Sequence, residues 1–367
     1  MNDPTRRRFL AGAGTAATAG LAGCGGLVST TNSRAPPVLD QRPAGVYLPT
    51  HVEGMLMAGR TTVGGLEVAL TYTLPHRFWT VTKSDGRFTT NRTEIEQDDA
   101  VHLMATVWEP ETGVVVPNTG LSLEISRDGD LVSEEVIYPM LAQRMGFHYG
   151  ANFPLDGDGT YDVRVSVGGV STPRYGAFEG RFEEPAAATI PLEYSREEVT
   201  GVDYRNLDRQ GEPDAVEPMA MDGMPVGRVP DPFPGDALGS GSLGDLQVTA
   251  TRVDADRFGS DPYLAVAAVT PYNQLAVPGA AMEAGVEGAG AGSDGGSGSG
   301  SSDGGAGDGL ITLSPAIDPE LGVHYGASVP GLAPDAAVEL RVTVPPQVAR
   351  HEGYETAFLQ SGAVDLA

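Results

Sequence analysis

One stretch of this chain occurs twice, and the repetition constrains the fold more than any other feature. Residues 138–152 read YPMLAQRMGFHYGAN, and residues 314–328 read SPAIDPELGVHYGAS. The first copy carries two methionines and His148, whereas the second keeps only a histidine, His324. Two copies of one motif, one with soft ligands and one without, indicate a duplicated module in which a single site works. We expect both copies to form a tight glycine turn.

The repetition extends over whole modules. The run LQVTATRV at 246–253 parallels LEVALTYT at 66–73, and PYLAVAAVTP at 262–271 parallels VHLMATVWEP at 101–110. Short apolar runs separated by abundant turn residues, with Gly 50 and Pro 28, are typical of strands. The sequence therefore predicts an all-β fold of two Ig-like β-sandwich modules related by internal duplication and packed as a pseudo-dimer.

The N-terminus has the pattern of an export signal. Arg6, Arg7 and Arg8 precede an Ala/Gly-rich apolar run that ends in a lipobox-like sequence at Cys24. We expect lipidation of Cys24 to anchor the exported protein to the outer face of the cytoplasmic membrane; a plain signal peptide with a chance cysteine is the alternative. The predicted organisation is a signal peptide at 1–23, an anchor and flexible tether at 24–42, a metal-binding module at 43–193, an acidic connector at 194–243 and a degenerate second module at 244–367 with a Gly/Ser loop at 288–309.

Charge and cysteine content exclude several functions. The net charge of −26 argues against nucleic-acid binding, which needs a basic face, and is typical of the acidic surfaces of halophilic proteins. Because Cys24 is the only cysteine, the mature modules have no internal disulfide, no cysteine-based zinc site and no blue-copper centre. A metal site here must use histidine, methionine and carboxylate side chains.

The run VHLMATVW at 101–108 is the strand with the most informative pattern. Alternation places His102 and Met104 on one face, and Leu103 and Ala105 on the other. The second face is apolar and belongs in a core. The first face offers an imidazole and a thioether that point the same way.

Four short motifs in order, VHLMATV, YPM, HYGAN and ARHEGYETAF, make the chain resemble the periplasmic high-affinity iron-transport protein family. This resemblance implies an Ig-like, copper-binding protein that accompanies Fe(II) uptake, usually as a dimer. The family's ligands fall on His102, Met140, His148 and the histidine of the Arg-His motif, His351. Met104 replaces the strand carboxylate of the family, which favours copper over iron(II), although iron(II) stays open.

The distribution of these residues between the copies predicts how the site is assembled. The second copy has lost the other ligands, yet it carries His351, where the first copy has Tyr175. If the modules pack as a pseudo-dimer, the C-terminal histidine reaches across to the first module. The predicted single inter-module site consists of His102, Met104, Met140, His148 and His351.

A second candidate site lies in the first apolar run of the first module. In THVEGMLM, alternation puts His51, Glu53, Met55 and Met57 on one strand face, either as a secondary metal site or as an ordinary half-buried strand. His76 and His324 are assigned structural roles.

Nothing in the sequence predicts catalysis, because nucleophile elbows and phosphate-binding loops are absent. We expect a metal-binding lipoprotein that assists iron transport, with the membrane and an iron permease as partners, as a monomer of pseudo-dimeric modules or as a homodimer. The alternatives are a structural or adhesion protein of the cell surface and a protein of copper delivery or resistance.

Overall fold

The structure is a computed structural model that describes residues 36–287 and 309–366. Nearly all of their regular structure is β, which confirms the predicted all-β class. The predicted lipid-attachment residue Cys24, the signal segment 1–23 and nearly all of the Gly/Ser loop lie outside the described residues. Within the described ranges, no helix has the length and apolar character needed to span a membrane.

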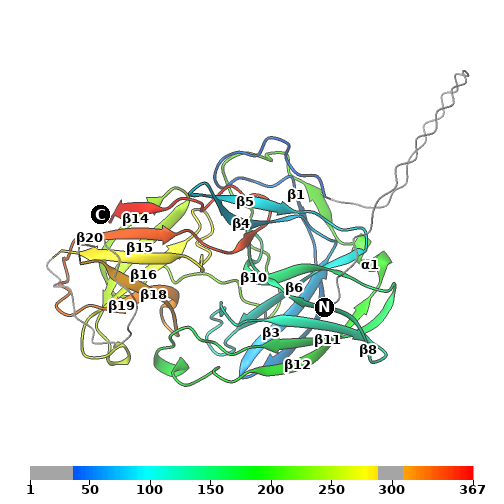
Figure 1. Cartoon of the computed structure of the whole chain (residues 1–367), viewed down its shortest axis with the longest axis horizontal. Helices are drawn as coiled ribbons and strands as arrows, with labels where there is room; N and C mark the ends of the chain where they lie inside the picture. Colours follow the sequence, from blue (N-terminus) through cyan, green and yellow to red (C-terminus); the bar gives the residue numbers. More distant parts are fainter. Residues whose placement is uncertain (1–35, 288–308, 367) are drawn as a thin grey trace, which may run out of the picture. The chain divides into compact units, whose positions relative to one another are not determined.

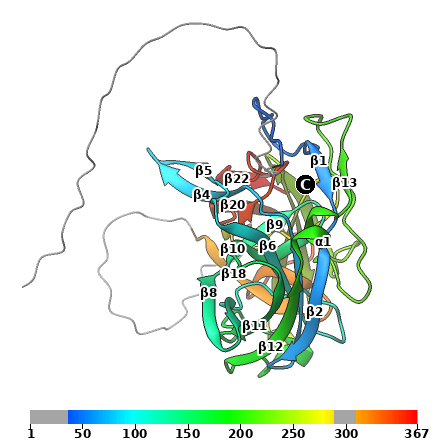
Figure 2. The same ribbon diagram turned by 90° about the vertical axis from the view of Figure 1, so that its right-hand side faces the viewer.

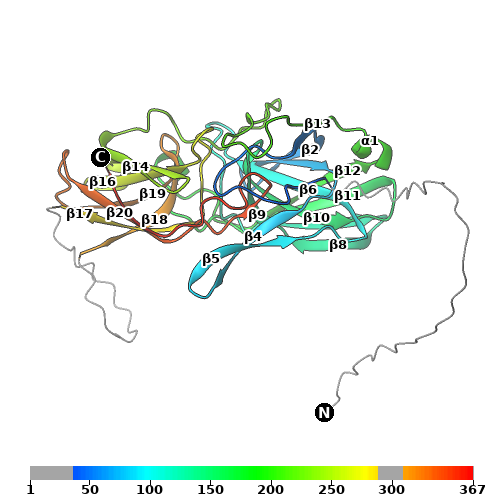
Figure 3. The same ribbon diagram turned by 90° about the horizontal axis from the view of Figure 1, so that it is seen from above.

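The first module is a sandwich of two sheets (Figure 1). The larger sheet has the order β2 (Leu56–Val63), β3 (Leu66–Thr73), β6 (Asp99–Trp108), β10 (Gly146–Pro154), β9 (Tyr138–Ala142), β21 (Ala349–Arg350), β4 (Phe78–Ser84) and β5 (Arg87–Thr93). The smaller sheet has the order β12 (Ala186–Tyr194), β11 (Gly159–Val167), β7 (Ser122–Arg127) and β8 (Asp130–Val136). The hairpin of β4 and β5 extends beyond the neighbouring strands of its sheet (Figure 3).

Alternation along β6 accounts for the core of this sandwich. Leu103 and Ala105 are fully buried and share one hydrophobic cluster with Val163 and Val165 of the smaller sheet. Full burial of such a side chain contributes about 1.5–3 kcal/mol. The apolar face of β6 therefore packs in the core, as predicted.

The strands of the second module hydrogen-bond to one another in a single continuous series. Its strands, in spatial order, are β14 (Asp236–Leu243), β15 (Leu246–Val253), β16 (Tyr263–Val269), β19 (Gly322–Ser328), β18 (Ile311–Asp318), β17 (Ala281–Val286), β20 (Val338–Val344) and β22 (Gly362–Asp365). The first half of β18 pairs with β17 and its second half with β19. One strand thus takes part in both layers of the module.

The two modules share one strand register. In each module the strand that carries HYGA pairs with the same two neighbours at equivalent residues. In the first module the cross-strand pairs are His102–Asn152, Met104–Gly150 and Met140–His148. The corresponding pairs of the second module are, in the same order, Tyr263–Ser328, Ala265–Gly326 and Ala316–His324. The sequence alignment of the two copies therefore describes equivalent positions in space.

The repeated stretch itself differs from the expected glycine turn. HYGAN lies inside strand β10, and the turn precedes it, where Gly146 has a φ of +67°. In the second module Gly322 has a φ of +66° at the same place. Positive φ is readily adopted only by glycine, so these two residues close the hairpins.

Each module contributes a short segment to the other module's sheet. β21 runs parallel to β9, with Arg350 paired to Leu141, and it also contacts β4 through Trp79. Reciprocally, Arg174 forms a parallel bridge with Ile317 of the second module. This exchange brings the C-terminal segment of the chain to the first module.

Shorter elements complete the described fold. β1 (His51–Glu53) pairs with β13 (Tyr204–Asn206) in a two-stranded sheet, visible in Figure 2. The helical elements are η1 (Gly176–Phe178), α1 (Arg196–Thr200) and η2 (Asp256–Phe258).

Candidate metal centre

His102 of β6 and His148 of β10 project from the face of the larger sheet that is turned away from the sandwich core. Neighbouring pairs place Met104 beside Gly150 and His102 beside Asn152 on this face. A sheet face outside the sandwich is ordinarily solvated. Here His102, Met104 and His148 are almost completely buried. Rings from other segments lie against the two histidines, namely those of His76, Phe78 and His351.

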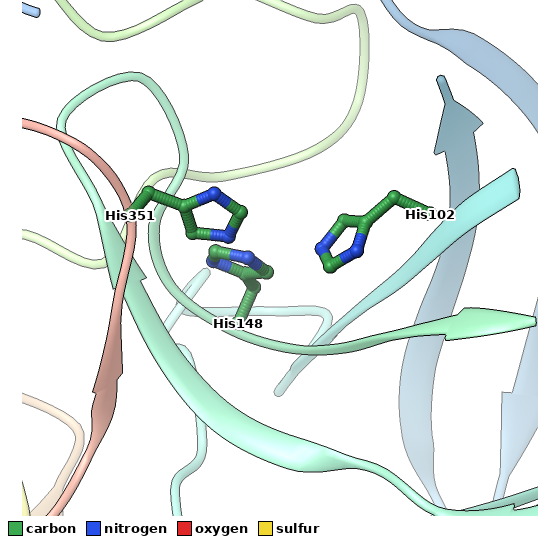
Figure 4. Close-up of side chains that lie close together, drawn as sticks. All are labelled: His102, His148 and His351. Carbon is green, nitrogen blue, oxygen red and sulfur yellow. The ribbon is translucent and has the colours of Figure 1, made fainter. Parts of the chain in front are cut away.

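Three imidazoles converge beneath this cover. The ligand nitrogens of His102, His148 and His351 all lie within 4.8 Å of one another. Figure 4 shows the three rings pointing toward one another from three separate segments of the chain. His351 follows β21, and its backbone N–H donates to the carbonyl of Leu141 at 3.2 Å, which fixes its position beside β9. The structure thus brings together three of the five residues of the predicted inter-module site around one point.

Hydrogen bonding sets the tautomer of His148. Its Nδ1 lies 3.1 Å from the carbonyl oxygen of Gly146. A carbonyl can only accept, so Nδ1 carries the proton and the neutral ring presents a lone pair at Nε2. The Nε2 atom is therefore the available ligand atom.

Asn152 sets the tautomer of His102 in the same way. The amide group of Asn152 donates from Nδ2 to the carbonyl of His76 at 2.9 Å, which identifies its other terminal atom as the oxygen. That oxygen accepts from the backbone N–H of His76 and from Nδ1 of His102, at 2.8 Å from the latter. Nε2 of His102 is thus unprotonated, and Asn152 holds the ring as an outer partner of a metal ligand would.

One ring nitrogen of each histidine is left without a hydrogen bond in the part of the chain that the structure describes. The Nε2 atoms of His102, His148 and His351 are buried and lack any hydrogen-bond partner among the described residues. An unsatisfied buried polar atom costs about 1–3 kcal/mol. Three such atoms around one point are the arrangement expected of a site that binds a cation.

Burial keeps these imidazoles neutral. Loss of solvation lowers the pKa of His148 to about 4, and it lowers those of His102 and His351 well below the ordinary value of 6.5. Neighbouring histidines lower all three pKa values further. A metal ion can therefore bind near neutral pH without displacing protons from these rings.

Met140 supplies a soft atom at the same place. A Cβ built on Gly150 would lie 3.0 Å from Nε2 of His102 and 3.1 Å from the Sδ of Met140. The missing side chain at position 150 leaves room for these two atoms to approach. Met140 is fully buried, and it is the cross-strand partner of His148. Met104, on the same face of β6 as His102, lines the cavity next to the histidines.

In the second module, the side chain of Tyr263 occupies the position that corresponds to the histidine centre. Tyr263, at the position of His102, lies with its hydroxyl against Gly326 and 3.2 Å from Nε2 of His324. Tyr175 and Phe258 pack against the same tyrosine ring. His324 therefore has partners inside the protein, as its assigned structural role requires.

His76 was assigned a structural role from the sequence, but the structure places it against the centre. Its ring centroid lies 5.1 Å from that of His102 and 5.4 Å from that of His351. Its Nε2–H donates to Oε1 of Glu53 at 2.7 Å. A lone histidine far in sequence from its partners gives no spacing signal, so pattern reading could not find it.

The predicted secondary set does not lie on one strand. β1 ends at Glu53 and β2 begins at Leu56, so the expected alternation from His51 to Met57 is interrupted. Met57 is 42% exposed, whereas Met55 lines the cavity together with His51 and Glu53. The expectation of a single strand face is wrong, because Gly54 and Met55 separate two strands that belong to different sheets.

The side chains of this centre fit a copper ion better than a hard cation. Imidazole and thioether ligands suit copper, whereas carboxylate and carbonyl oxygens suit Mg(II), Ca(II) and Mn(II). Three imidazoles with a thioether at hand provide the softer donor set. The fold and this cluster define a two-module β-sandwich protein with a buried candidate metal centre.

The chain belongs to the family described as "Domain of unknown function (DUF7350)", which matches residues 73–183 and 231–367. The match includes all three histidines of the centre. No curated protein matches the chain significantly.

Two solved structures of FetP from uropathogenic Escherichia coli strain F11 are similar in part. The protein as isolated, expressed in the periplasm of E. coli, is 21% identical with a TM-score of 0.27, and the match covers 39% of this chain and 97% of that one. A copper-bound variant is 23% identical with a TM-score of 0.29, covering 38% and 97%. At these TM-scores the similarity supports no conclusion about the site.

Proposed function

We propose that this protein is an extracytoplasmic, membrane-anchored copper-binding lipoprotein that assists high-affinity iron transport. The ion is held by His102, His148 and His351, with the thioether of Met140 as a further ligand and Met104 beside it. The convergence of three buried, unpaired Nε2 atoms carries the proposal. The choice of copper follows from the donor set. We propose a binding role and no catalysis.

The iron-transport part of the proposal is supported by the order of the sequence motifs, which runs through His102, Met140, HYGAN and the Arg-His pair. It predicts that a strain lacking the protein grows poorly when iron is scarce. Wild-type protein restores growth, and His148→Gln does not. Equal growth of the two complemented strains under iron limitation, together with copper sensitivity of the deletion strain, would instead assign the protein to copper delivery or resistance.

The copper site is tested with a matched pair of histidine substitutions. His148 and His324 occupy equivalent register positions, and both donate from Nδ1 to a glycine carbonyl at 3.1 Å. We expect His148→Gln to weaken Cu(I) binding by more than the roughly 10–100-fold that loss of an outer partner costs. His324→Gln should bind like the wild type. Competition with a chromophoric Cu(I) chelator measures both affinities; equal affinities would overturn the assignment.

The anchor is tested separately. Cys24→Ala should abolish labelling by a fatty-acid analogue and move the protein from the membrane fraction to the supernatant. Retention of Cys24→Ala on the membrane would refute lipidation at this residue.

A further inference from the structure

A cavity of about 110 Å³ adjoins the histidine centre. His148 and His351 line one part of its wall. Another part is lined by His51, Glu53 and His76, which the proposed copper site does not use. Two imidazoles and a carboxylate therefore face the same space from outside the first site.

Glu53 is the central group of this second cluster. Its side chain is only 6% exposed. One oxygen, Oε1, accepts from the hydroxyl of Thr73 at 2.6 Å and from the Nε2–H of His76 at 2.7 Å. The other oxygen, Oε2, is buried without a hydrogen-bond partner among the described residues. A buried carboxylate oxygen that is left unpaired requires a compensating group.

His51 faces this oxygen with a lone pair. Thr50 has one hydroxyl proton, and the carbonyl of Pro37 and a carboxylate oxygen of Glu352 lie within hydrogen-bond distance as acceptors. The hydroxyl therefore accepts from Nδ1 of His51, which is 2.8 Å away. The neutral His51 ring then has no proton on Nε2, which lies 3.9 Å from Oε2 of Glu53. Two electron-rich atoms face each other across that distance.

A metal ion between these atoms would relieve their repulsion. Nitrogen and oxygen ligands bind such ions at about 2.0–2.2 Å, so two ligands of one ion lie roughly 3–4 Å apart. The observed 3.9 Å separation falls in this range. Two arginines also line the cavity, but Arg144 donates to the backbone carbonyl of Glu53 and Arg77 to that of Pro36, so neither satisfies Oε2.

We infer that Glu53, His51 and His76 form a second site, which binds a divalent cation of the Fe(II) or Mn(II) class. Oε2 of Glu53 and Nε2 of His51 are free to bind the ion, and His76 joins them by releasing the Nε2 proton that it donates to Glu53. Two histidines and one carboxylate are the donor set typical of such ions, in contrast to the softer first centre. His51 and Glu53 precede the family-matched segment that begins at residue 73. The inference does not depend on copper at the first centre, and it replaces Met55 and Met57 of the sequence-based set by His76.

The probe is Mn(II), whose free-ion electron paramagnetic resonance signal disappears on binding. Titration of the purified full-length protein at neutral pH should remove one equivalent of the signal. We expect Glu53→Gln, which keeps the side-chain volume and removes the charge, to weaken Mn(II) binding at least about tenfold. Glu94→Gln, which changes an exposed carboxylate paired with Arg77 and Arg92, is the control and should bind like the wild type.

A second variant tests the site in case Glu53→Gln does not fold. His76→Gln changes a side chain that is 19% exposed, and it should also weaken Mn(II) binding while circular dichroism shows a folded protein. Wild-type Mn(II) affinity in both folded variants, or no Mn(II) binding by the wild type, would overturn the second site. Cu(I) affinity is measured on the same samples, so that failure of one site is distinguished from failure of the other.

Discussion

In the second module the hydroxyl of Tyr263 donates a hydrogen bond to Nε2 of His324 over 3.2 Å, whereas the equivalent nitrogen of His148 has no protein partner among the described residues. The two imidazoles are otherwise alike, because each donates from Nδ1 to the carbonyl of the glycine that closes its hairpin. The chain therefore contains two equivalent histidines, of which one has a hydrogen bond at Nε2 and the other has none within the described part of the chain.

Substitution of Gly150 should block the centre without disturbing the strand. The backbone at this position does not require glycine, but a Cβ would sit 3.0 Å from Nε2 of His102 and 3.1 Å from Sδ of Met140. We expect Gly150→Ala to weaken Cu(I) binding by about tenfold or more, an effect of the size seen when supporting groups of a metal site are lost. Chelator competition measures the affinity and thermal unfolding checks the fold. Unchanged affinity in a folded protein would contradict the placement of these two ligands.

Asn152 should matter for both copper affinity and stability. Asn152→Leu keeps the approximate volume but leaves His102 Nδ1 and the backbone polar groups of His76 without partners. We expect Cu(I) affinity to fall roughly 10–100-fold. The free energy of unfolding should fall by about 1–3 kcal/mol. Chelator competition and urea denaturation measure the two effects, with Asn91→Leu on the exposed β5 strand as the control; the prediction fails if the two variants behave alike.

Arg350 holds the segment that carries His351. Its guanidinium is completely buried, and burial lowers its pKa to about 10. It donates only to backbone carbonyls, namely those of Pro346, Val348, Ala357 and Phe358. Arg350→Met leaves these carbonyls unsatisfied, and each buried acceptor without a partner costs about 1–3 kcal/mol. We therefore expect a loss of several kcal/mol in unfolding free energy and weaker Cu(I) binding.

Urea denaturation and chelator competition test this role. Arg341→Met, on the exposed side of β20, the strand before β21 in the sequence, is the control and should change little. A stable Arg350→Met protein with wild-type copper affinity would show that the guanidinium does not position His351.

His324 should make stability depend on pH. Burial lowers its pKa from 6.5 to about 4, so between these values the unfolded chain binds a proton that the folded protein does not. Stability must therefore fall as the pH drops through this window, with a contribution of about 2–3 kcal/mol at pH ~4.5. We expect the unfolding free energy of metal-free His324→Gln to change less between pH ~7 and ~4.5 than that of the wild type. Parallel slopes in urea denaturation would contradict a buried neutral His324.

Local patterns predicted the strands and the outlines of the centre. Alternation in 101–108 correctly assigned Leu103 and Ala105 to the core, and the repeat placed Tyr263 at the register position of His102. The first result depends only on the two-residue period of a strand. The second depends on the alignment of the two copies. Gly150 carried a further signal, since glycine inside a strand marks a close approach of other atoms.

The cover of the centre could not be read from the sequence. Local alternation gives no indication that His76, Phe78 and His351 pack against His102 on the second face of β6. The contact between His76 and Glu53 likewise depends on how β1 and the residues before β4 are packed. Such long-range placement is determined by the whole fold, and the resemblance to a family supplied only the expectation for His351.

His102 and His351 belong to one polypeptide, although they come from different modules. In an assembly of two separate chains, such a centre would come apart on dilution, because subunit association is a second-order process. Within a single chain the histidine is delivered at a fixed effective concentration by the covalent connection. A centre of this kind keeps its composition however dilute the protein is.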